Sequence, residues 1–149
     1  EMRMNYTMMG DTVNLAARLE SSAKQYGVYN FVGENIYEVA KSQFAFRFLD
    51  FVKVKGKNIP VKVYELVADK GEILSNNINL IKLFEEGIDY YFKQDWKMAL
   101  NKFHKSENLE DRFESRNTTP SQIYIERCNM FLDNPPEQDW DGVWRMTSK

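Results

Sequence analysis

The sequence predicts an α+β protein in which a mixed α/β segment is followed by an all-α helical tail. Apolar runs of strand length alternate with helical patterns over residues 1–68 and include a pair of strands joined at Gly56-Lys57-Asn58. A polar stretch over residues 69–78 reads as a linker. Over residues 79–149 apolar side chains recur mainly at helical spacing, which predicts the tail.

The first element is a helix expected to run from Asp11-Thr12 to Tyr26. Either of its first two side chains can cap the helix by accepting a hydrogen bond from an unpaired amide, and Gly27 is a typical residue just past a helix end. Asn14 and Arg18 are four positions apart and therefore share one face near the positive end of the helix. A carboxamide and a guanidinium there form a plausible site for a phosphate-bearing ligand.

Short strands and a second helix follow the first helix. Residues 28–32 predict a strand, and a helix opens at Gly33. Residues 44–49 are aromatic and favour a strand, whereas residues 50–55 alternate apolar and charged side chains, as a strand with one wet face does. The chain returns over residues 59–67, which predicts a hairpin.

Three helices are predicted in the tail. The first two are separated by Gln94-Asp95, and Gly87 and Ala99 are small at the point where an antiparallel pair would cross. The third begins near Thr119-Pro120-Ser121, with proline in its first turn. Charged residues on the first two helices are expected to form a solvated face: Lys82, Glu85, Glu86, Lys93, Lys97, Lys102 and Lys105.

Composition limits the kinds of site. A net charge of −2 gives no general electrostatic attraction for nucleic acid. The single Cys128, expected to be buried, excludes an internal disulfide and indicates a reducing, cytoplasmic location. Together with the single His104 it cannot form a Cys/His metal site. No stretch approaches the roughly 20 apolar residues of a membrane-spanning helix, although an anchor upstream stays an alternative.

The end of the chain carries two tryptophans in a polar setting. Trp140 and Trp144 are expected to fold back onto the helices. The alternative is an exposed pair that marks a surface for a protein partner.

The start of the chain resembles the class III adenylate and guanylate cyclases. The matching positions are Tyr6, Gly10, Asp11, Val13, Asn14, Ala16, Ala17 and Arg18. Val54-Lys55-Gly56-Lys57 and Val63-Tyr64-Glu65-Leu66 fit that family's later hairpin, so the resemblance covers roughly residues 6–67. It implies the C-terminal portion of a ferredoxin-like catalytic domain. Because the chain begins within a motif, we expect it to be part of a longer protein.

The tail resembles a tetratricopeptide repeat (TPR). The positions on that pattern are Leu83, Gly87, Tyr90, Ala99, Phe103 and Ser106. The usual closing proline is absent, and Asp111 stands near its place. A cyclase segment followed by helices and a string such as Trp140-Asp141-Gly142-Val143 is similar to spirochaete-like bacterial cyclases.

The cyclase resemblance implies an adenylate cyclase that converts ATP to 3′,5′-cyclic AMP and pyrophosphate. It implies that Arg18 stabilises charge on the α-phosphate and that Asn14 orients the ribose. Lys57 would contact the terminal phosphates, with Lys55 as the runner-up. Thr7 occupies the base-reading position, where a hydroxyl favours adenine over guanine without strong discrimination.

The resemblance also implies parts that this chain lacks. In the family two aspartates bind two Mg²⁺ or Mn²⁺ ions, and they come from strands that precede the segment present here. We therefore expect the site to be shared, across a homodimer or with the upstream half of the domain, and the tail to bind a possible protein partner. One alternative is an inactive cyclase-homology module that signals through the tail. A third hypothesis is a helical interaction domain that retains a cyclase remnant.

Overall fold

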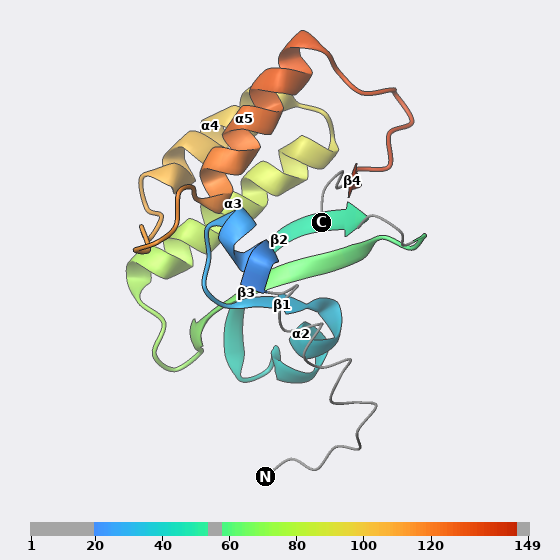
Figure 1. Ribbon diagram of the computed structural model, residues 1–149. Coiled ribbons are helices and arrows are strands. Elements are labelled where there is room, and N and C mark those ends of the chain that lie inside the picture. Colours follow the sequence, from blue (N-terminus) through green and yellow to red (C-terminus); the bar gives the residue numbers. More distant parts are fainter. Residues whose placement is uncertain (1–19, 54–57, 146–149) are drawn as a thin grey trace.

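A four-stranded sheet forms the centre of the protein, which a computed structural model describes over residues 20–53 and 58–145 (Figure 1). The strands of this sheet are β1 (Phe31–Gly33), β2 (Phe44–Lys53), β3 (Val61–Asp69) and β4 (Trp144–Arg145). The labelled helices of the protein are α2 (Glu34–Ala40), α3 (Ser75–Phe92), α4 (Trp96–Glu107) and α5 (Pro120–Asp133). The strand order is β1-β3-β2-β4, with β4 parallel to β2 and the other pairs antiparallel. The expected α+β class is confirmed.

The helix before Gly27 is described over residues 20–26, and its expected beginning lies outside the described residues. Gly27 has a φ of 77°, and a Cβ atom there would lie 2.1 Å from the carbonyl oxygen of Thr118. A residue without a side chain is therefore required at this stop, as the sequence predicts. The next strand was expected over residues 28–32 but is β1, Phe31–Gly33. Val28 lies outside it, and its carbonyl oxygen accepts a hydrogen bond from Arg116 Nε at 2.8 Å.

The predicted hairpin is confirmed as the pair β2–β3. Phe48 lies opposite Tyr64 and Val52 lies opposite Val61, but the register shifts between Phe48 and Asp50. A shift of one residue reverses the faces to which the following side chains point. Asp50, expected on a wet face, is consequently fully buried. The expectation of a simple alternation over residues 50–55 was wrong at this position.

The three predicted tail helices are confirmed. The Asp95 side chain accepts a hydrogen bond from Met98 N at the start of α4, and Thr119 accepts one from Gln122 N at the start of α5. A Cβ at Gly87 would lie 2.7 Å from the Phe103 ring, so glycine allows α3 and α4 to approach closely. This arrangement is a helical hairpin plus one helix, and its relation to the tetratricopeptide repeat stays a prediction.

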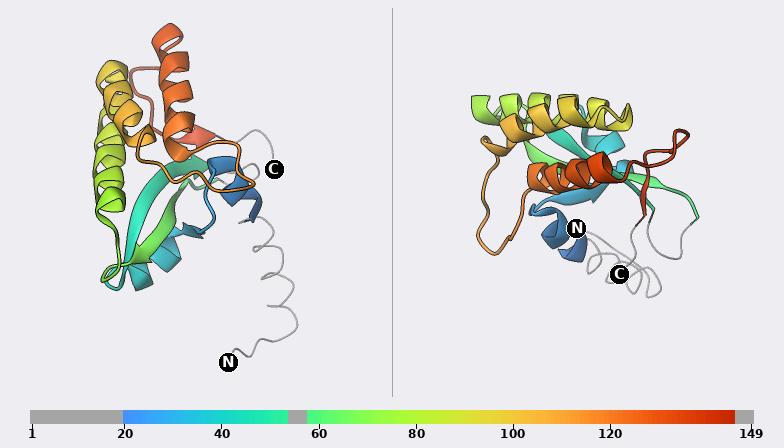
Figure 2. Two further views of the ribbon diagram at one scale, coloured as in Figure 1. Left: turned by 90° about the vertical axis from the view of Figure 1, so that its left-hand side faces the viewer. Right: turned by 90° about the horizontal axis from the view of Figure 1, so that it is seen from above.

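The helices pack on the sheet around an aromatic core. Phe84, Tyr91, Phe103 and Tyr124 are all fully buried, and Phe48 of β2 packs against this cluster. Figure 2 shows the helix formed by residues 20–26 on the side of the strands away from α3 and α4, close to the beginning of α5. The linker expected over residues 69–78 is shorter in the structure. Strand β3 ends at Asp69 and α3 begins at Ser75, so only residues 70–74 connect them. The division into two domains stays a prediction.

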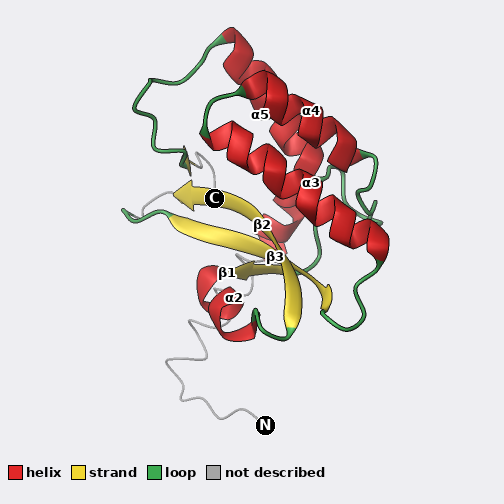
Figure 3. Cartoon of the chain, turned by 180° about the vertical axis from the view of Figure 1, so that it is seen from behind, coloured by secondary structure: helices red, strands yellow, loops and turns green. Residues whose placement is uncertain are grey.

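The end of the chain returns to the sheet. Trp140 lies against Tyr91 and Phe131, and Trp144 packs against Phe131, so both tryptophans fold back as expected. Trp144 also begins β4, which lies beside the end of β2 (Figure 3). The expected tail is all-α, whereas the described tail ends in this strand. Cys128 is fully buried, as predicted.

Glu85 departs from the expected solvated face of the tail helices. Its Oε2 accepts a hydrogen bond from the backbone N–H of Phe48 at 3.1 Å, on the edge of β2 that does not face β3. The side chain is half-buried rather than exposed. It covers a strand edge that would otherwise present an unpaired donor.

Candidate functional site

The four predicted site residues lie outside the described part of the chain. Thr7, Asn14 and Arg18 belong to residues 1–19, and Lys57 belongs to residues 54–57. The structure describes the elements that flank them: the helix formed by residues 20–26 follows Arg18, and strands β2 and β3 lie on either side of Lys57.

A buried polar cluster surrounds Asp50, at the point where the flanking elements meet. The Tyr26 hydroxyl donates to Oδ2 of Asp50 at 2.5 Å, and the Tyr124 hydroxyl contacts Oδ1 at 2.9 Å and the Leu49 carbonyl oxygen at 2.7 Å. Arg127 donates to both carboxylate oxygens, at 2.7 and 3.2 Å. Three segments are thereby joined at one carboxylate: the helix before Gly27, strand β2 and helix α5. We call these four residues, Tyr26, Asp50, Tyr124 and Arg127, the Asp50 cluster.

The electrostatics of the Asp50 cluster favour a fixed pattern of donors. Burial, reinforced by the adjacent Asp50 carboxylate, raises the pKa of Tyr26 and of Tyr124, so both hydroxyls keep their protons. Burial alone would lower the pKa of Arg127, but Asp50 raises it well above its ordinary value. The Arg127 guanidinium also lies 3.8 Å from the centre of the Trp144 ring, a cation–π contact. The cluster is therefore a buried ion pair between Asp50 and Arg127 to which two tyrosine hydroxyls are added.

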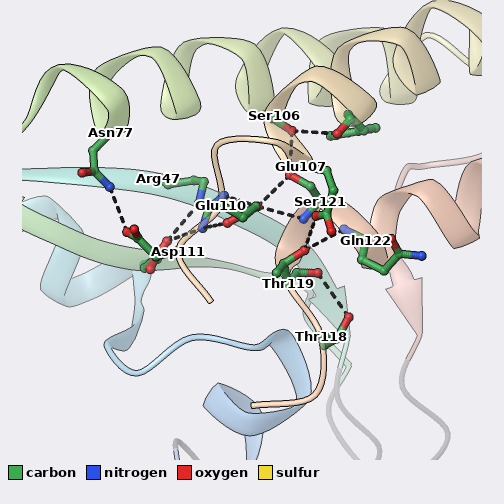
Figure 4. A network of polar contacts seen from close by, with 12 residues as sticks. Arg47, Asn77, Ser106, Glu107, Glu110, Asp111, Thr118, Thr119, Ser121 and Gln122 are labelled. Carbon is green, nitrogen blue, oxygen red and sulfur yellow. Dashed lines mark hydrogen bonds and ion pairs between the residues drawn. The ribbon is translucent and has the colours of Figure 1, made fainter. Parts of the chain in front are cut away.

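A second buried cluster joins the sheet to the connection between α4 and α5 (Figure 4). Arg47 Nη2 lies 2.6 Å from Glu65 Oε1, and Arg47 Nη1 lies 2.7 Å from Glu110 Oε2. Ser121 donates to Glu110 through its backbone N–H at 3.0 Å and its hydroxyl at 2.6 Å. We call Arg47, Glu65, Glu110 and Ser121 the Arg47 cluster. One buried guanidinium thus bridges two buried carboxylates, and Ser121 supplies two further donors to Glu110, an arrangement that indicates a structural role.

The described residues offer no ready metal centre. Within residues 20–53 and 58–145, no group of three or more His, Cys, Asp or Glu side chains is placed to hold a metal ion. The three buried carboxylates, Asp50, Glu65 and Glu110, are each already paired with an arginine. A divalent ion would have to displace those arginines, so these carboxylates do not fit the pair of metal-binding aspartates that the cyclase resemblance implies. Nor is any helix of the described part long and apolar enough to cross a membrane.

Comparison with known proteins finds a family match for the first part of the chain. Residues 1–68 match the family model of the adenylate and guanylate cyclase catalytic domain. This cyclase-matching segment contains all four predicted site residues and, in the described part, the helix before Gly27, β1, α2, β2 and most of β3. The Asp50 and Arg47 clusters therefore both connect the cyclase-matching segment to the helices that follow it.

Relatives named as adenylate cyclases cover the chain to different extents. The chain is 30% identical over 132 residues to "Adenylate cyclase, terminal-differentiation specific" of Dictyostelium discoideum, a match that covers 86% of this chain and 6% of that protein. It is 40% identical over 65 residues to "Adenylate cyclase 1" of Rhizobium meliloti and 38% identical over 69 residues to "Adenylate cyclase" of Anabaena cylindrica. The chain thus spans 6%, 10% and 14% of these relatives. No solved structure matches it.

The Dictyostelium relative also resembles the helical part of the chain. Its match of 132 residues is much longer than the 68-residue cyclase-matching segment, so the similarity continues into α3, α4 and α5. The two bacterial matches cover only 44% of the chain each. The combination of a cyclase segment with these helices is therefore shared with at least one protein named as an adenylate cyclase.

Sequence reasoning missed the Asp50 cluster. Asp50 and Arg127 are charged residues in amphipathic patterns, where solvent exposure is the ordinary expectation. Their burial follows from the register shift in β2 and from the docking of α5, which no local pattern specifies. The nearest signal is that Tyr26 and Tyr124, each in an apolar helical stretch, carry hydroxyls that need a partner when buried.

Proposed function

We propose that this chain forms part of an adenylate cyclase that converts ATP to 3′,5′-cyclic AMP and pyrophosphate. In this reaction the ribose 3′ oxygen attacks the α-phosphorus and loses its proton, while the bond from the α-phosphorus to the bridging oxygen breaks and pyrophosphate leaves. The main support is the match of residues 1–68 to the cyclase catalytic domain. The adenylate cyclase names of the relatives support ATP as the substrate.

The predicted site residues take the roles that the resemblance implies. Arg18 stabilises the charge that develops on the α-phosphate, and Asn14 orients the ribose. Lys57 contacts the terminal phosphates, and Thr7 contacts the base. This set supplies one half of a site shared within a homodimer or with the upstream half of the domain.

Divalent metal ions, Mg²⁺ or Mn²⁺, would be held by two aspartates from strands that precede the segment present here. When bound, such ions activate the attacking oxygen and neutralise the phosphates. The residues of this chain bind and orient the nucleotide and stabilise charge. We place this part of the protein in the cytoplasm, where ATP is available, with any anchor located upstream.

The proposal is tested by cyclic-nucleotide production from ATP or GTP with Mn²⁺ by the intact protein that contains this chain. Arg18→Ala should lower kcat by about 100-fold and change KM much less, because the arginine acts mainly in the transition state. Lys24→Ala is a matched control, since it removes an exposed cation from the same predicted helix. Unchanged turnover in Arg18→Ala would contradict the assigned role.

The second candidate is an inactive cyclase-homology module that signals through its helical tail. The observation that favours it is the pair of buried clusters that join the cyclase-matching segment to α5 and to the α4–α5 connection. Buried contacts of this kind between two segments suit a protein that transmits a change of conformation from one segment to the other. A folded, dimeric protein that produces no cyclic nucleotide from ATP or GTP would favour this function over catalysis.

A further inference from the structure

We propose that helix α5 fixes the position of the catalytic helix through Asp50, so that Tyr26 is a positioning residue for Asn14 and Arg18. By catalytic helix we mean the predicted helix from about residue 11 to Tyr26, which the structure describes over residues 20–26. The catalytic consequence rests on the proposed function, but the mechanical link rests on described contacts alone.

The first step is the attachment of the catalytic helix to the sheet. Ala23 and Tyr26 are buried in one apolar cluster with Leu49, Val52 and Val63 of the hairpin, and Ile123 of α5 packs against the same cluster. These contacts are apolar and set no direction about the helix axis. The hydrogen bond from Tyr26 to Asp50 does fix the rotation of the helix about its axis, because a hydrogen bond is directional. Among the described residues, this hydrogen bond links a side chain of residues 20–26 to the rest of the protein.

The second step is the fixing of Asp50 by α5. A fully buried carboxylate is costly unless it is paired and hydrogen-bonded, and Arg127 and Tyr124 of α5 supply both requirements. Arg127 approaches the carboxylate with two donors, which fixes its plane as well as its position. The acceptor that Tyr26 meets is therefore oriented by the tail helix.

The third step is the distance over which a displacement acts. In the helix that the sequence predicts, Arg18 precedes Tyr26 by eight positions and Asn14 precedes it by twelve. We infer that a change of orientation at Tyr26 would be carried along this predicted helix to Arg18 and Asn14. A misplacement of about 1 Å in a catalytic group can cost up to about 100-fold in rate, so a modest loss of orientation has a measurable effect.

The Arg47 cluster provides an internal comparison. It also ties the cyclase-matching segment to the tail through a buried ion pair, Arg47–Glu110, yet none of its described contacts reaches residues 20–26. Weakening it should affect stability without altering the orientation of the catalytic helix. A comparison of variants in the two clusters therefore distinguishes general destabilisation of the protein from a change in the orientation of the catalytic helix.

The test compares three variants, each of which removes a hydroxyl that donates a hydrogen bond to a buried carboxylate. Tyr26→Phe and Tyr124→Phe each remove one from Asp50, and Ser121→Ala removes one from Glu110. We measure kcat and KM for cyclic AMP formation per folded protein, together with hydrogen exchange of the amides of residues 20–28. Tyr26→Phe should lower kcat about 5- to 10-fold with KM changed less than about 2-fold, and should speed amide exchange. Tyr124→Phe should change both quantities in the same direction, whereas Ser121→Ala should change neither.

Two results would overturn the inference. In the first, Tyr26→Phe keeps native kcat and native amide exchange. In the second, all three variants lower kcat and speed exchange equally, which shows general destabilisation. If the unmodified protein makes no cyclic nucleotide, the proposed function fails, and the exchange data still decide whether α5 fixes the helix. Accelerated exchange in Tyr26→Phe but not in Tyr124→Phe would overturn the part assigned to Tyr124 and would leave the hold of α5 on Asp50 to Arg127 alone.

Discussion

Arg47 of β2 and Glu110, which follows α4, form a buried ion pair at 2.7 Å although 63 positions separate them in the sequence. Arg47 lies in the cyclase-matching segment and Glu110 lies in the helical part beyond it. Both charged groups are buried, so separating the two segments would leave a buried charge unpaired or expose it to water. The sheet and the helices therefore depend on each other for stability.

Removal of Arg47 should be strongly destabilising. Arg47→Met leaves Glu65 and Glu110 buried without their cation, which should cost about 3–5 kcal/mol of unfolding free energy. Urea denaturation followed by circular dichroism measures this loss. Lys41→Ala breaks the exposed Lys41–Glu38 pair and serves as the control, with an unchanged midpoint expected. Equal midpoints for the two variants would contradict a structural role for the buried pair.

Gly27 should not tolerate a side chain. Its positive φ and the 2.1 Å approach of a Cβ to the Thr118 carbonyl oxygen predict that Gly27→Ala loses at least about 2 kcal/mol of stability. Gly71→Ala is the matched control, because its Cβ would meet only the Asp69 side chain at 3.4 Å. Thermal unfolding of both variants makes the comparison, and a native Tm for Gly27→Ala would show that the helix end adopts another conformation.

Glu85 should make stability depend on pH. Burial raises its pKa, the Phe48 N–H partly opposes this, and nearby Asp89 adds to the rise. The folded state thus binds this proton more readily than the unfolded state, so the contribution of Glu85 is greatest at low pH and is lost as the pH rises through the raised pKa.

Glu85→Gln should therefore be more stable than the native protein at neutral pH. The difference should vanish below the ordinary pKa of a glutamate, about 4.3. Urea midpoints across this range measure it. The exposed Glu72→Gln variant controls for the loss of one negative charge and should be stabilised less. A Glu85→Gln variant that is less stable than the native protein at every pH would contradict this reasoning.

Cys128 should react with thiol reagents only when the protein unfolds. Burial raises its pKa to about 12, although the nearby Arg127 partly opposes the shift, so little thiolate exists at neutral pH. Because the chain has one cysteine, labelling by an aromatic disulfide reports on this site alone. The labelling rate should rise with urea in parallel with unfolding. Rapid labelling without denaturant would indicate that α5 opens locally.

The elements that sequence predicted share a local chemical cause. Gly27 ends a helix, Asp95 caps α4, and Thr119 with Pro120 begins α5, and each acts through atoms within a few residues of itself. The hairpin β2–β3 also follows from short-range alternation and a turn. Such signals are complete in the sequence, so their positions were predicted well.

The buried charges could not be predicted in the same way. Asp50 turns inward because of a register shift in β2, and its partners Tyr26 and Arg127 lie 24 and 77 positions away. A charged residue in a strand or an amphipathic helix ordinarily faces water. Only the docking of α5 reverses that expectation. The roles of Thr7, Asn14, Arg18 and Lys57 still depend on the motif and the family match, since they lie outside the described residues.

The parallel pairing of β4 with β2 has a practical consequence for labelling. Val52 lies opposite Trp144 and Lys53 lies opposite Arg145, so the chain leaves both strands at the same place and in the same direction. A fluorophore joined just after Arg145 would begin beside the departure point of the residues that include Lys57. Such a fluorophore would test at close range the proposed contact between Lys57 and the nucleotide, whereas an affinity tag at the same place could obstruct that contact.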